Sequence, residues 1–581
     1  MARTAAVGVQ DFGKIIENQI FYVDKTHFIK EWWDSKDDVT LITRPRRFGK
    51  TLAMNMLEYF FSVRYEGRSD LFETLAVWED EAYRKLQGTY PVIFLSFAGV
   101  KANNYNDARE GLLQEFVDVY NRYDFLLESD RLSSREKEAF LNVKENMSDM
   151  TAARAFLRLS NFLYQYYEKK VIILLDEYDT PIQEAYAGGY WREMTDFMRG
   201  LFNYTFKTNP YLERAVMTGI TRVSKESIFS DLNNLEVITA ASKKYETAFG
   251  FTQREVFQAL CEFGLSDQAD DVKRWYDGFR FGDCDNIYNP WSVIKFLDEK
   301  KFAPYWVNTS SNRLIGRLLQ KGSPKLKTAF EDLLQGREVC AMFDEQVVFD
   351  QLDEDEASVW GFLLAAGYVK IAGYHTIHPG FGTEGIAYEL RLTNLEIELV
   401  FQKLIRGWFS VCGSSYEDFT KAFLLHDVRH MNIFMNRIAL ATISFFDAGS
   451  RASQISEPER FYHGLVLGLM VDLRDRYTIT SNRESGFGRY DVLFEPYRDT
   501  DDGMILEFKV AEQGESLQDT AKAAIRQIIN KRYAAGLEQK CRKDKIRLYG
   551  FAFRGKEVYI DGGYLGELEE SMLSVQPDFH R

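Results

Sequence analysis

Two neighbouring stretches decide the fold of the C-terminal part of the chain: Gly488-Arg-Tyr-Asp-Val-Leu-Phe494 and Met504-Ile-Leu-Glu-Phe-Lys-Val510. Both alternate apolar and polar residues, and the turn formers Asp499-Thr-Asp-Asp-Gly503 lie between them. This pattern predicts two strands joined as a β-hairpin. A helical pattern follows the second strand, so we expect an α/β domain here.

Two carboxylates and an ammonium group should meet on one face of this hairpin. Side chains two apart on a strand share a face, so Glu507 and Lys509 should project together toward Asp491. Clustered carboxylate oxygens suit a hard cation such as Mg²⁺ or Mn²⁺, which lowers the pKa of a bound water. Lys509 would orient that water or offset charge that develops on a phosphorane. The other face is predicted to enter a core through Leu506, Phe508 and Val510.

The order of these groups resembles the PD-(D/E)xK nuclease superfamily in its RecB-like form, which has a downstream helix with a glutamine. The resemblance implies hydrolysis of phosphodiester bonds, with Asp491 and Glu507 as metal ligands. It also implies catalytic roles for Asp491, Glu507, Lys509 and Gln527. The alternative for the Glu-x-Lys pair is the solvated face of an ordinary strand.

This chain departs from the RecB-like pattern at one position. The pattern has a tyrosine four residues after the glutamine, where this chain has Lys531, and Tyr533 lies two residues further on. Such folds often add an upstream acidic group, and Glu459, just after Pro458, is the candidate metal ligand. A helix N-terminal carboxylate that faces water is an equally good interpretation of Glu459.

A second candidate site lies near the N-terminus, where a strand, a loop and a helix follow one another. Residues 38–42 form the predicted strand, 43–48 the loop, and the helix opens at Gly49-Lys50-Thr51. Backbone N–H groups at such a helix start can cradle phosphates, while a lysine reaches the terminal phosphates and a hydroxyl binds Mg²⁺. We predict that ATP is bound here by Phe48, Gly49, Lys50 and Thr51. The first glycine of the usual motif is replaced by Arg44.

A continuous apolar run, Val171-Ile-Ile-Leu-Leu175, is typical of a central parallel strand buried on both faces. It ends in Asp176 and Glu177. Asp176 would hold Mg²⁺ through water, and Glu177 would polarise the attacking water. A loop start or a helix cap is the alternative for this acidic pair.

A third strand is predicted from Arg214 to Thr218, and a fourth from Pro91 to Phe97. The Thr218 hydroxyl could sense a γ-phosphate, and Arg222 is a candidate transition-state arginine, although a solvent-facing loop arginine fits as well. Strands separated by helices predict a doubly wound parallel sheet of the P-loop (ASCE/AAA-like) type, with nucleotide at the C-terminal ends of its strands.

Nearly the whole chain resembles bacterial proteins that join an AAA-like ATPase domain to a C-terminal PD-(D/E)xK nuclease domain. The shared motifs are Tyr22-Val-Asp-Lys-Thr26, the loop from Arg44 to Thr51, Trp275-Tyr-Asp-Gly278 and Ile287-Tyr-Asn-Pro290. In that family an arginine at the position of Arg44 is ordinary, so it does not count against nucleotide binding. The resemblance implies ATP and Mg²⁺ (or Mn²⁺) as cofactors, nucleic acid as partner with DNA favoured over RNA, and a role against foreign nucleic acid.

A chain of 581 residues is expected to form two to four domains, and we predict three. The first, residues 1–245, would be the ATPase domain, and residues 246–410 a helical lid with a winged-helix-like unit. Residues 411–581 would form the nuclease domain after a linker at 449–459. The aromatic residues of the lid either pack it against the sheet or line an adenine pocket.

Charge is distributed unevenly along the chain. Residues 521–556 hold eleven Lys and Arg against two Asp and Glu, a charge of +9, which leaves −24 for the rest of a chain whose total is −15. Such acidity argues against a protein that coats duplex DNA. The basic segment is either a surface for a nucleic-acid backbone or a solvated face.

No apolar stretch reaches the ~20 residues that a membrane span needs, and the start lacks a signal peptide's apolar core, so we expect a cytoplasmic protein without membrane contact. The five cysteines are scattered, which excludes the usual zinc and iron–sulfur spacings. The sequence favours a metal-dependent nuclease coupled to ATP. The alternatives are a nucleotide-gated switch or adaptor that does not cut, and an ATPase with an inactive nuclease relic. Whether the protein forms a homo-oligomer stays open.

Overall fold

A computed structural model describes residues 3–221, 228–229, 232–308, 311–343, 352, 355–377, 385–410, 414–446, 456–485, 488–512 and 514–573. The chain divides into two compact units. Unit 1 comprises residues 1–309 and 340–397, and unit 2 comprises 310–339 and 398–581. The predicted domain boundaries after residues 245 and 410 stay predictions.

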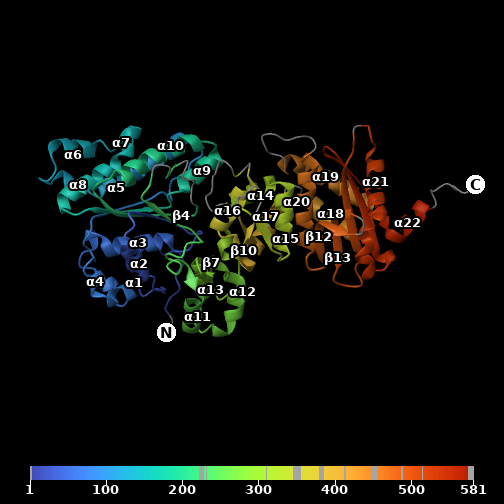
Figure 1. Ribbon diagram of the computed structural model, residues 1–581, viewed down its shortest axis with the longest axis horizontal. Helices are drawn as coiled ribbons and strands as arrows, with labels where there is room; N and C mark the ends of the chain where they lie inside the picture. The colour runs from blue at the N-terminus through green and yellow to red at the C-terminus, as the bar shows by residue number, and fades with distance from the viewer. Residues whose placement is uncertain are drawn as a thin grey trace, which may run out of the picture. The chain divides into compact units, whose positions relative to one another are not determined.

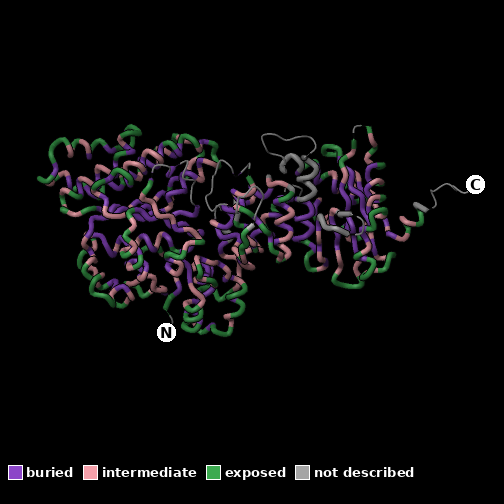
Figure 2. Tube along the Cα trace, in the orientation of Figure 1, coloured by how far each residue is buried: buried purple, intermediate pink, exposed green. Residues whose placement is uncertain are grey.

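Unit 1 contains a five-stranded parallel sheet with the strand order β2-β3-β4-β1-β5. The strands are β1 (Val39–Thr43), β2 (Val92–Ser96), β3 (Val171–Asp176), β4 (Leu212–Gly219) and β5 (Leu235–Ile238). All residues of β1 and β3 are buried, and buried residues run through the sheet in Figure 2. A parallel strand that is buried on both faces has an uninterrupted run of apolar residues, which is why the sequence predicted β3.

Helices cover both faces of this sheet (Figure 1). On one side lie α1 (Phe12–Glu17), α2 (His27–Ser35) and α3 (Lys50–Phe61). On the other lie α5 (Tyr105–Asn121), α8 (Ala155–Tyr167) and α10 (Trp191–Phe202). The first layer buries Trp32 and Phe60 against Ile172 and Val216 of the sheet. The unit is therefore α/β with helices on both sides of a parallel sheet.

The rest of unit 1 is a smaller α/β region. It contains α11 (Gln253–Glu262), α12 (Ala269–Tyr276), α13 (Pro290–Glu299), α16 (Glu356–Ala365) and the start of α17 (Leu395–Trp408). Its strands are β6 (Phe251–Thr252), β7 (Phe279–Phe281), β8 (Cys284–Tyr288) and the hairpin β10 (Val369–Ile377) and β11 (Gly385–Leu392). The ring of Trp275 stacks on Phe302 with centroids 5.9 Å apart, inside the cluster that these helices form. This aromatic residue packs within the region, and not against the large sheet as predicted.

Unit 2 contains a mixed sheet with the order β12-β13-β14-β15-β16. Its strands are β12 (Tyr477–Ser485), β13 (Gly488–Pro496), β14 (Gly503–Val510), β15 (Ile546–Arg554) and β16 (Glu557–Tyr564). The strands β13 and β14 are antiparallel and pair Val492 with Leu506, so the predicted hairpin is confirmed. Leu506 and Phe508 are buried as expected, but Val510 is 44% exposed, because the strand ends there.

Helices lie on both sides of this sheet (Figure 1). Unit 2 contains the helices α14 (Ser311–Lys321), α15 (Pro324–Leu334), α18 (Ser415–Leu424), α19 (Val428–Phe446), α20 (Ser456–Leu473), α21 (Leu517–Asn530) and α22 (Leu565–Leu573). The ring of Phe423 in α18 contacts Phe494 and Tyr549 on one face, at 5.4 and 5.3 Å. On the other face α21 packs on β14 and β15. Residues 449–455 of the predicted linker lie outside the described residues, and 456–459 belong to α20.

The edge strand β16 is covered by two side-chain amides of α19. Asn432 exchanges hydrogen bonds with the backbone of Ile560, and Asn436 does the same with Val558, at 2.6–3.0 Å. An exposed strand edge can pair with another chain, so these amides satisfy groups that would otherwise promote aggregation. None of the described helices is both long and apolar enough to cross a bilayer.

Candidate functional sites

The carboxylates of Asp491 and Glu507 lie side by side on the β13–β14 hairpin. The backbone N–H of Asp491 donates to Glu507 Oε2 at 3.4 Å, and the backbone N–H of Phe508 donates to Asp491 Oδ2 at 2.7 Å. Only 4% of Glu507 is exposed. The structure therefore brings together the two acidic residues that the strand pattern placed on one face, and Lys509 is close enough to affect the charge of Glu507.

Helix α21 adds Gln527 to this pair. Its side-chain amide donates to Glu507 Oε1 and lies 3.4 Å from the hydroxyl of Tyr533. Tyr533 is buried, in a short 3₁₀ helix that follows α21. The structure thus places Gln527 next to Glu507 and Tyr533 next to Gln527. Tyr533 is two residues beyond the position that the RecB-like pattern gives the tyrosine.

Gly550 allows α21 to come this close, and sequence reasoning missed it. Gly550 is the register partner of Glu507 in the parallel pair β14–β15, so both positions face α21. A Cβ atom at Gly550 would lie 2.1 Å from the backbone oxygen of Ala521. A glycine inside a strand is a known signal for close approach of another backbone, and it could have identified this position.

The electrostatics of the hairpin site fit a divalent cation. Burial, and then the neighbouring charge of Asp491, raise the pKa of Glu507 to about 8, while Lys509 and the hydrogen bond from Gln527 oppose this rise. Two adjacent carboxylates in a desolvated position repel each other, and carboxylate oxygens are the ligands that Mg²⁺ and Mn²⁺ prefer. Within the described residues no group of three or more His, Cys, Asp and Glu side chains forms a metal cage. Glu459 lies in α20, and its side chain is outside the described residues.

The second site begins at Gly49, which precedes α3 in the left-handed conformation with φ 82°. Lys50 opens the helix, and its ammonium donates to the carbonyl oxygens of Arg44 and Pro45 at 2.9 Å each. Burial lowers the pKa of Lys50, while nearby carboxylates, chiefly that of Glu177, act in the opposite direction. The loop is thus wrapped around the lysine ammonium at the start of a helix.

Three predicted residues converge at the C-terminal end of β3. Thr51 Oγ1 donates to Asp176 Oδ2 at 2.7 Å, and Thr218 Oγ1 donates to Asp176 Oδ1 at 2.5 Å. Asp176 is 1% exposed, and burial raises its pKa while the two hydroxyl donors oppose the rise. A hydroxyl beside a carboxylate, next to a helix N-terminus, is a donor set that fits Mg²⁺ with nucleotide phosphates.

Glu177 follows Asp176 with a left-handed backbone, φ 51°. Its backbone N–H donates to Thr218 Oγ1 at 3.4 Å, and its carboxylate accepts from Thr180 Oγ1 at 3.1 Å. A non-glycine residue at positive φ is uncommon and recurs at functional sites. Arg222 lies outside the described residues, so its prediction is untested.

Asp179 is a residue of this site that the sequence analysis overlooked. It is 1% exposed, and its Oδ2 accepts from the backbone N–H groups of Ile220 and Thr221 at 2.9 and 3.0 Å and from the Thr221 hydroxyl at 3.0 Å. It thereby fixes the chain just after β4. The acidic run Asp176-Glu-Tyr-Asp179 was the available signal, but nothing in the sequence said that its last member turns inward.

The loop before α3 is clamped by residues distant in sequence. Arg44 is fully buried, donates to the carbonyl oxygens of Thr43 and Thr239 at 2.9 and 2.7 Å, and lies 4.3 Å from the centroid of the Phe281 ring. The ring of Phe48 packs on Phe279, with centroids 4.7 Å apart. The arginine in place of the usual glycine therefore serves to pack the loop. The Phe48 side chain does the same, so only its backbone is available to a ligand.

Trp306 and Glu396 form a second contact with this loop, and neither was predicted. The indole N–H of Trp306 donates to the backbone oxygen of Arg46 at 3.1 Å. Glu396 is 1% exposed, and it accepts from the backbone N–H of Trp306 at 2.5 Å and from Ser292 Oγ at 2.8 Å. Burial raises the pKa of Glu396 to about 7, and these hydrogen bonds oppose the rise.

One motif behind the family resemblance has a structural role. The ammonium of Lys25 donates to both carboxylate oxygens of Glu255 at 2.8 Å and to the backbone oxygen of Thr247 at 2.7 Å. Asp24 accepts from the backbone N–H groups of Thr26 and Ala76. The Tyr22–Thr26 segment therefore ties α2 to α11.

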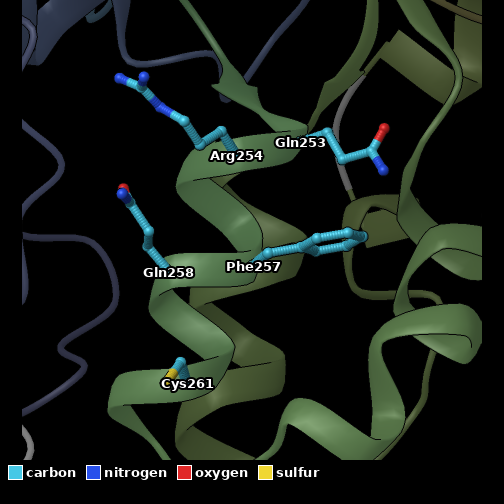
Figure 3. Close-up of a pocket in the computed structure, with 5 residues that line it drawn as sticks. All are labelled: Gln253, Arg254, Phe257, Gln258 and Cys261. Carbon is cyan, nitrogen blue, oxygen red and sulfur yellow. The ribbon is translucent and has the colours of Figure 1, made fainter.

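A surface pocket on α11 is shown in Figure 3. Its lining residues are Gln253, Arg254, Phe257, Gln258 and Cys261. They come from one helix, and none belongs to either candidate site.

Comparisons with known proteins assign the N-terminal and C-terminal parts of the chain, which hold the two candidate sites, to different families. Residues 6–229 match a family model described as "Predicted AAA-ATPase", and residues 457–562 match one described as "PD-(D/E)XK nuclease superfamily". A protein of Azotobacter chroococcum mcd 1, described as "Uncharacterized protein in vnfD 5'region", is 26% identical over 566 residues. That similarity covers 94% of this chain and 96% of the relative. The chain joins an AAA-ATPase-like domain to a C-terminal domain of the PD-(D/E)XK nuclease superfamily.

Proposed function

We propose that the C-terminal domain hydrolyses phosphodiester bonds of nucleic acid with Mg²⁺ or Mn²⁺, and that the N-terminal domain binds ATP and regulates this cleavage. The observation that carries the proposal is the hairpin site. There, Asp491 and the buried carboxyl of Glu507 are adjacent, and Gln527 donates to Glu507. A desolvated pair of carboxylates is costly to keep in a fold, and a cation that uses both would offset that cost.

Asp491 and Glu507 would hold the metal ion, which when bound supplies a water of lowered pKa and neutralises charge on the phosphate. Asp491 is kept in place by the backbone N–H of Phe508. Gln527 holds the orientation of Glu507, and the Lys509 ammonium would stabilise the charge that develops on the phosphorane. Glu459 and Tyr533 remain candidates for supporting roles.

In the N-terminal domain we infer an ATP site of the P-loop type at the C-terminal ends of β1, β3 and β4. The backbone from Phe48 to Thr51 would cradle the phosphates, with Lys50 on the terminal ones. Thr51 and Asp176 would hold Mg²⁺, since they are already hydrogen-bonded at 2.7 Å. Glu177 would polarise the attacking water, and Thr218 would sense the γ-phosphate.

The two activities would be linked because they share one chain. ATP can change cleavage only through a difference in its affinity for active and inactive arrangements, typically ~1–3 kcal/mol or about 5–150-fold. We propose that residues 246–410 form a helical lid and a winged-helix-like unit, and that this region takes part in the regulation of cleavage.

The test is a cleavage assay on the purified full chain. Plasmid, single-stranded DNA and RNA are incubated with Mg²⁺ or Mn²⁺, with and without ATP, and the products are resolved on gels. We expect metal-dependent cleavage of DNA whose rate changes with ATP in the wild type and is insensitive to ATP in Lys50→Ala. Binding of these substrates without any cleavage would instead favour an adaptor.

A further inference from the structure

Nine of the eleven basic residues of segment 521–556 fall into two groups in the structure, and the other two are Arg532 and Lys556. Six of them are in ion pairs with carboxylates: Lys540 with Glu495, Arg542 with Asp544, Lys543 with Glu569, Lys545 and Arg547 with Asp502, and Arg554 with Glu557. Three others, Lys522, Arg526 and Lys531, are exposed and form no ion pair with a described residue. The unpaired positive charge of the segment is therefore available at these three and at Lys556, which lies between β15 and β16 and not on α21.

These three residues belong to α21 and its C-terminal cap. Lys522 and Arg526 are four residues apart and so share one face of the helix, and Lys531 is four residues after Gln527. The face toward the sheet is made by Ala521, Ala524, Ile525 and Ile528, all buried. The basic residues thus project from the same helix that holds Gln527 against Glu507. At 3.6 residues per turn Lys522 and Arg526 lie on one flank of the exposed face, and Lys531 lies on the other flank, that of Gln527. The three cations therefore span the exposed face, and we call Lys522, Arg526 and Lys531 the α21 ridge.

We propose that the α21 ridge binds the phosphate backbone of the nucleic acid that is cut, and that the six paired basic residues contribute little. This inference rests on the proposed nuclease function. An unpaired cation that meets a phosphate releases condensed counterions, whereas a cation already neutralised by a carboxylate gains less. Asp519, one turn earlier on α21, accepts from Ser516 Oγ at 2.8 Å and marks the acidic end of the ridge.

The charge of the rest of the chain supports a local contact. Outside residues 521–556 the chain carries −24, so phosphate cannot be attracted by the molecule as a whole. Cations spread over the exposed face of the helix that carries Gln527 would position the backbone without reading its sequence. The substrate chemistry that fits is a polyphosphate chain, with no base specificity from these residues.

The experiment compares two triple variants of the full chain, both with Glu507→Gln so that nothing is cut. The ridge variant is Lys522→Gln/Arg526→Gln/Lys531→Gln, and the matched control is Lys540→Gln/Arg542→Gln/Lys543→Gln, which removes the same charge. Binding of fluorescein-labelled duplex DNA, single-stranded DNA and RNA is measured by anisotropy in Mg²⁺ over a range of KCl. Because each phosphate contact adds about 0.9 to the slope of log K against log salt on duplex DNA, the ridge variant should lose about 2–3 from that slope. The control should lose less than about 1.

A ridge variant with the parent slope, or a control that loses as much as the ridge variant, would overturn the inference while the nuclease function stands. If the parent binds none of the nucleic acids and the wild type cuts none, the proposed function fails and the inference with it. Polyglutamate serves as the second probe. Ridge-dependent binding of polyglutamate, without ridge-dependent binding of nucleic acid, would assign the ridge to an acidic protein and contradict the proposal.

Discussion

Gln527 donates a side-chain hydrogen bond to the carboxylate of Glu507, from a helix twenty residues further along the chain. The amide lies between Glu507 and Tyr533, whose hydroxyl is 3.4 Å away. Glu507 can thus keep one orientation although burial disfavours its charged form. The bond makes α21 part of the proposed metal site, and two predictions follow from it.

The first prediction concerns Gln527→Ala. Removal of the amide leaves Glu507 without the donor that orients it, so affinity for Mn²⁺ should fall about 10–100-fold, as is usual when a group that orients a metal ligand is removed. Isothermal titration with Mn²⁺ measures this, and Gln518→Ala, an exposed residue of the same helix, is the matched control. Unchanged Mn²⁺ affinity in Gln527→Ala would mean that the bond does not support the metal site.

The second prediction concerns Gly550→Ala. The added methyl group would meet the backbone oxygen of Ala521 at 2.1 Å, so α21 must shift or the free energy of unfolding must fall, typically by ~1–3 kcal/mol. Urea denaturation measures the loss, and cleavage should also slow because Gln527 moves with the helix. The methyl group that Gly566→Ala adds in α22 would have no other atom within 4 Å, so this control should keep or raise the free energy of unfolding. Equal stability of the two variants would contradict the close approach.

Alternating and continuous apolar runs were enough to predict the hairpin of Asp491 and Glu507 and the central strand β3. Both signals come from residues adjacent in sequence. Asp179 and Gly550 were missed because their roles depend on segments that the fold brings close, the chain after β4 and the backbone of α21. The net positive charge of residues 521–556 could be counted in the sequence. Which of these basic residues pair with carboxylates depends on the folded surface and could not be predicted.

The third prediction concerns nucleotide. Lys50→Ala should weaken ATP binding, because the only lysine at the start of α3 is removed. Glu177→Gln should keep the affinity for ATP and stop its hydrolysis, because an amide retains the shape but cannot polarise water. Calorimetry measures the affinity, and phosphate release measures the hydrolysis. Equal ATP affinity of the wild type and Lys50→Ala would remove the proposed site.

The fourth prediction concerns pH and Glu396. Its pKa is raised to about 7 in the folded protein, mainly by burial, and lies near ~4.3 in an unfolded chain. The folded state therefore binds the proton more tightly between these values. The contribution of Glu396 to stability is fully present below about pH 4.3 and is lost as the pH rises through about 7, by roughly 3–4 kcal/mol in total.

Denaturation of the full chain at several pH values checks this, with Glu396→Gln as the comparison. The amide cannot ionise, so the difference in stability between Glu396→Gln and the wild type should change with pH in this window. A difference that is constant from about pH 5 to 8 would show that the carboxyl does not titrate there.

Single-turnover cleavage of DNA by wild type and Glu507→Gln in Mg²⁺ or Mn²⁺ tests most directly whether Asp491 and Glu507 form a metal-dependent cutting site. Thermal unfolding of both proteins first establishes that the variant is folded. The wild type should cut only with metal, and Glu507→Gln should be slower by about 10³-fold or more, since one member of a catalytic unit is removed. A folded Glu507→Gln protein that cuts at the wild-type rate would contradict the account.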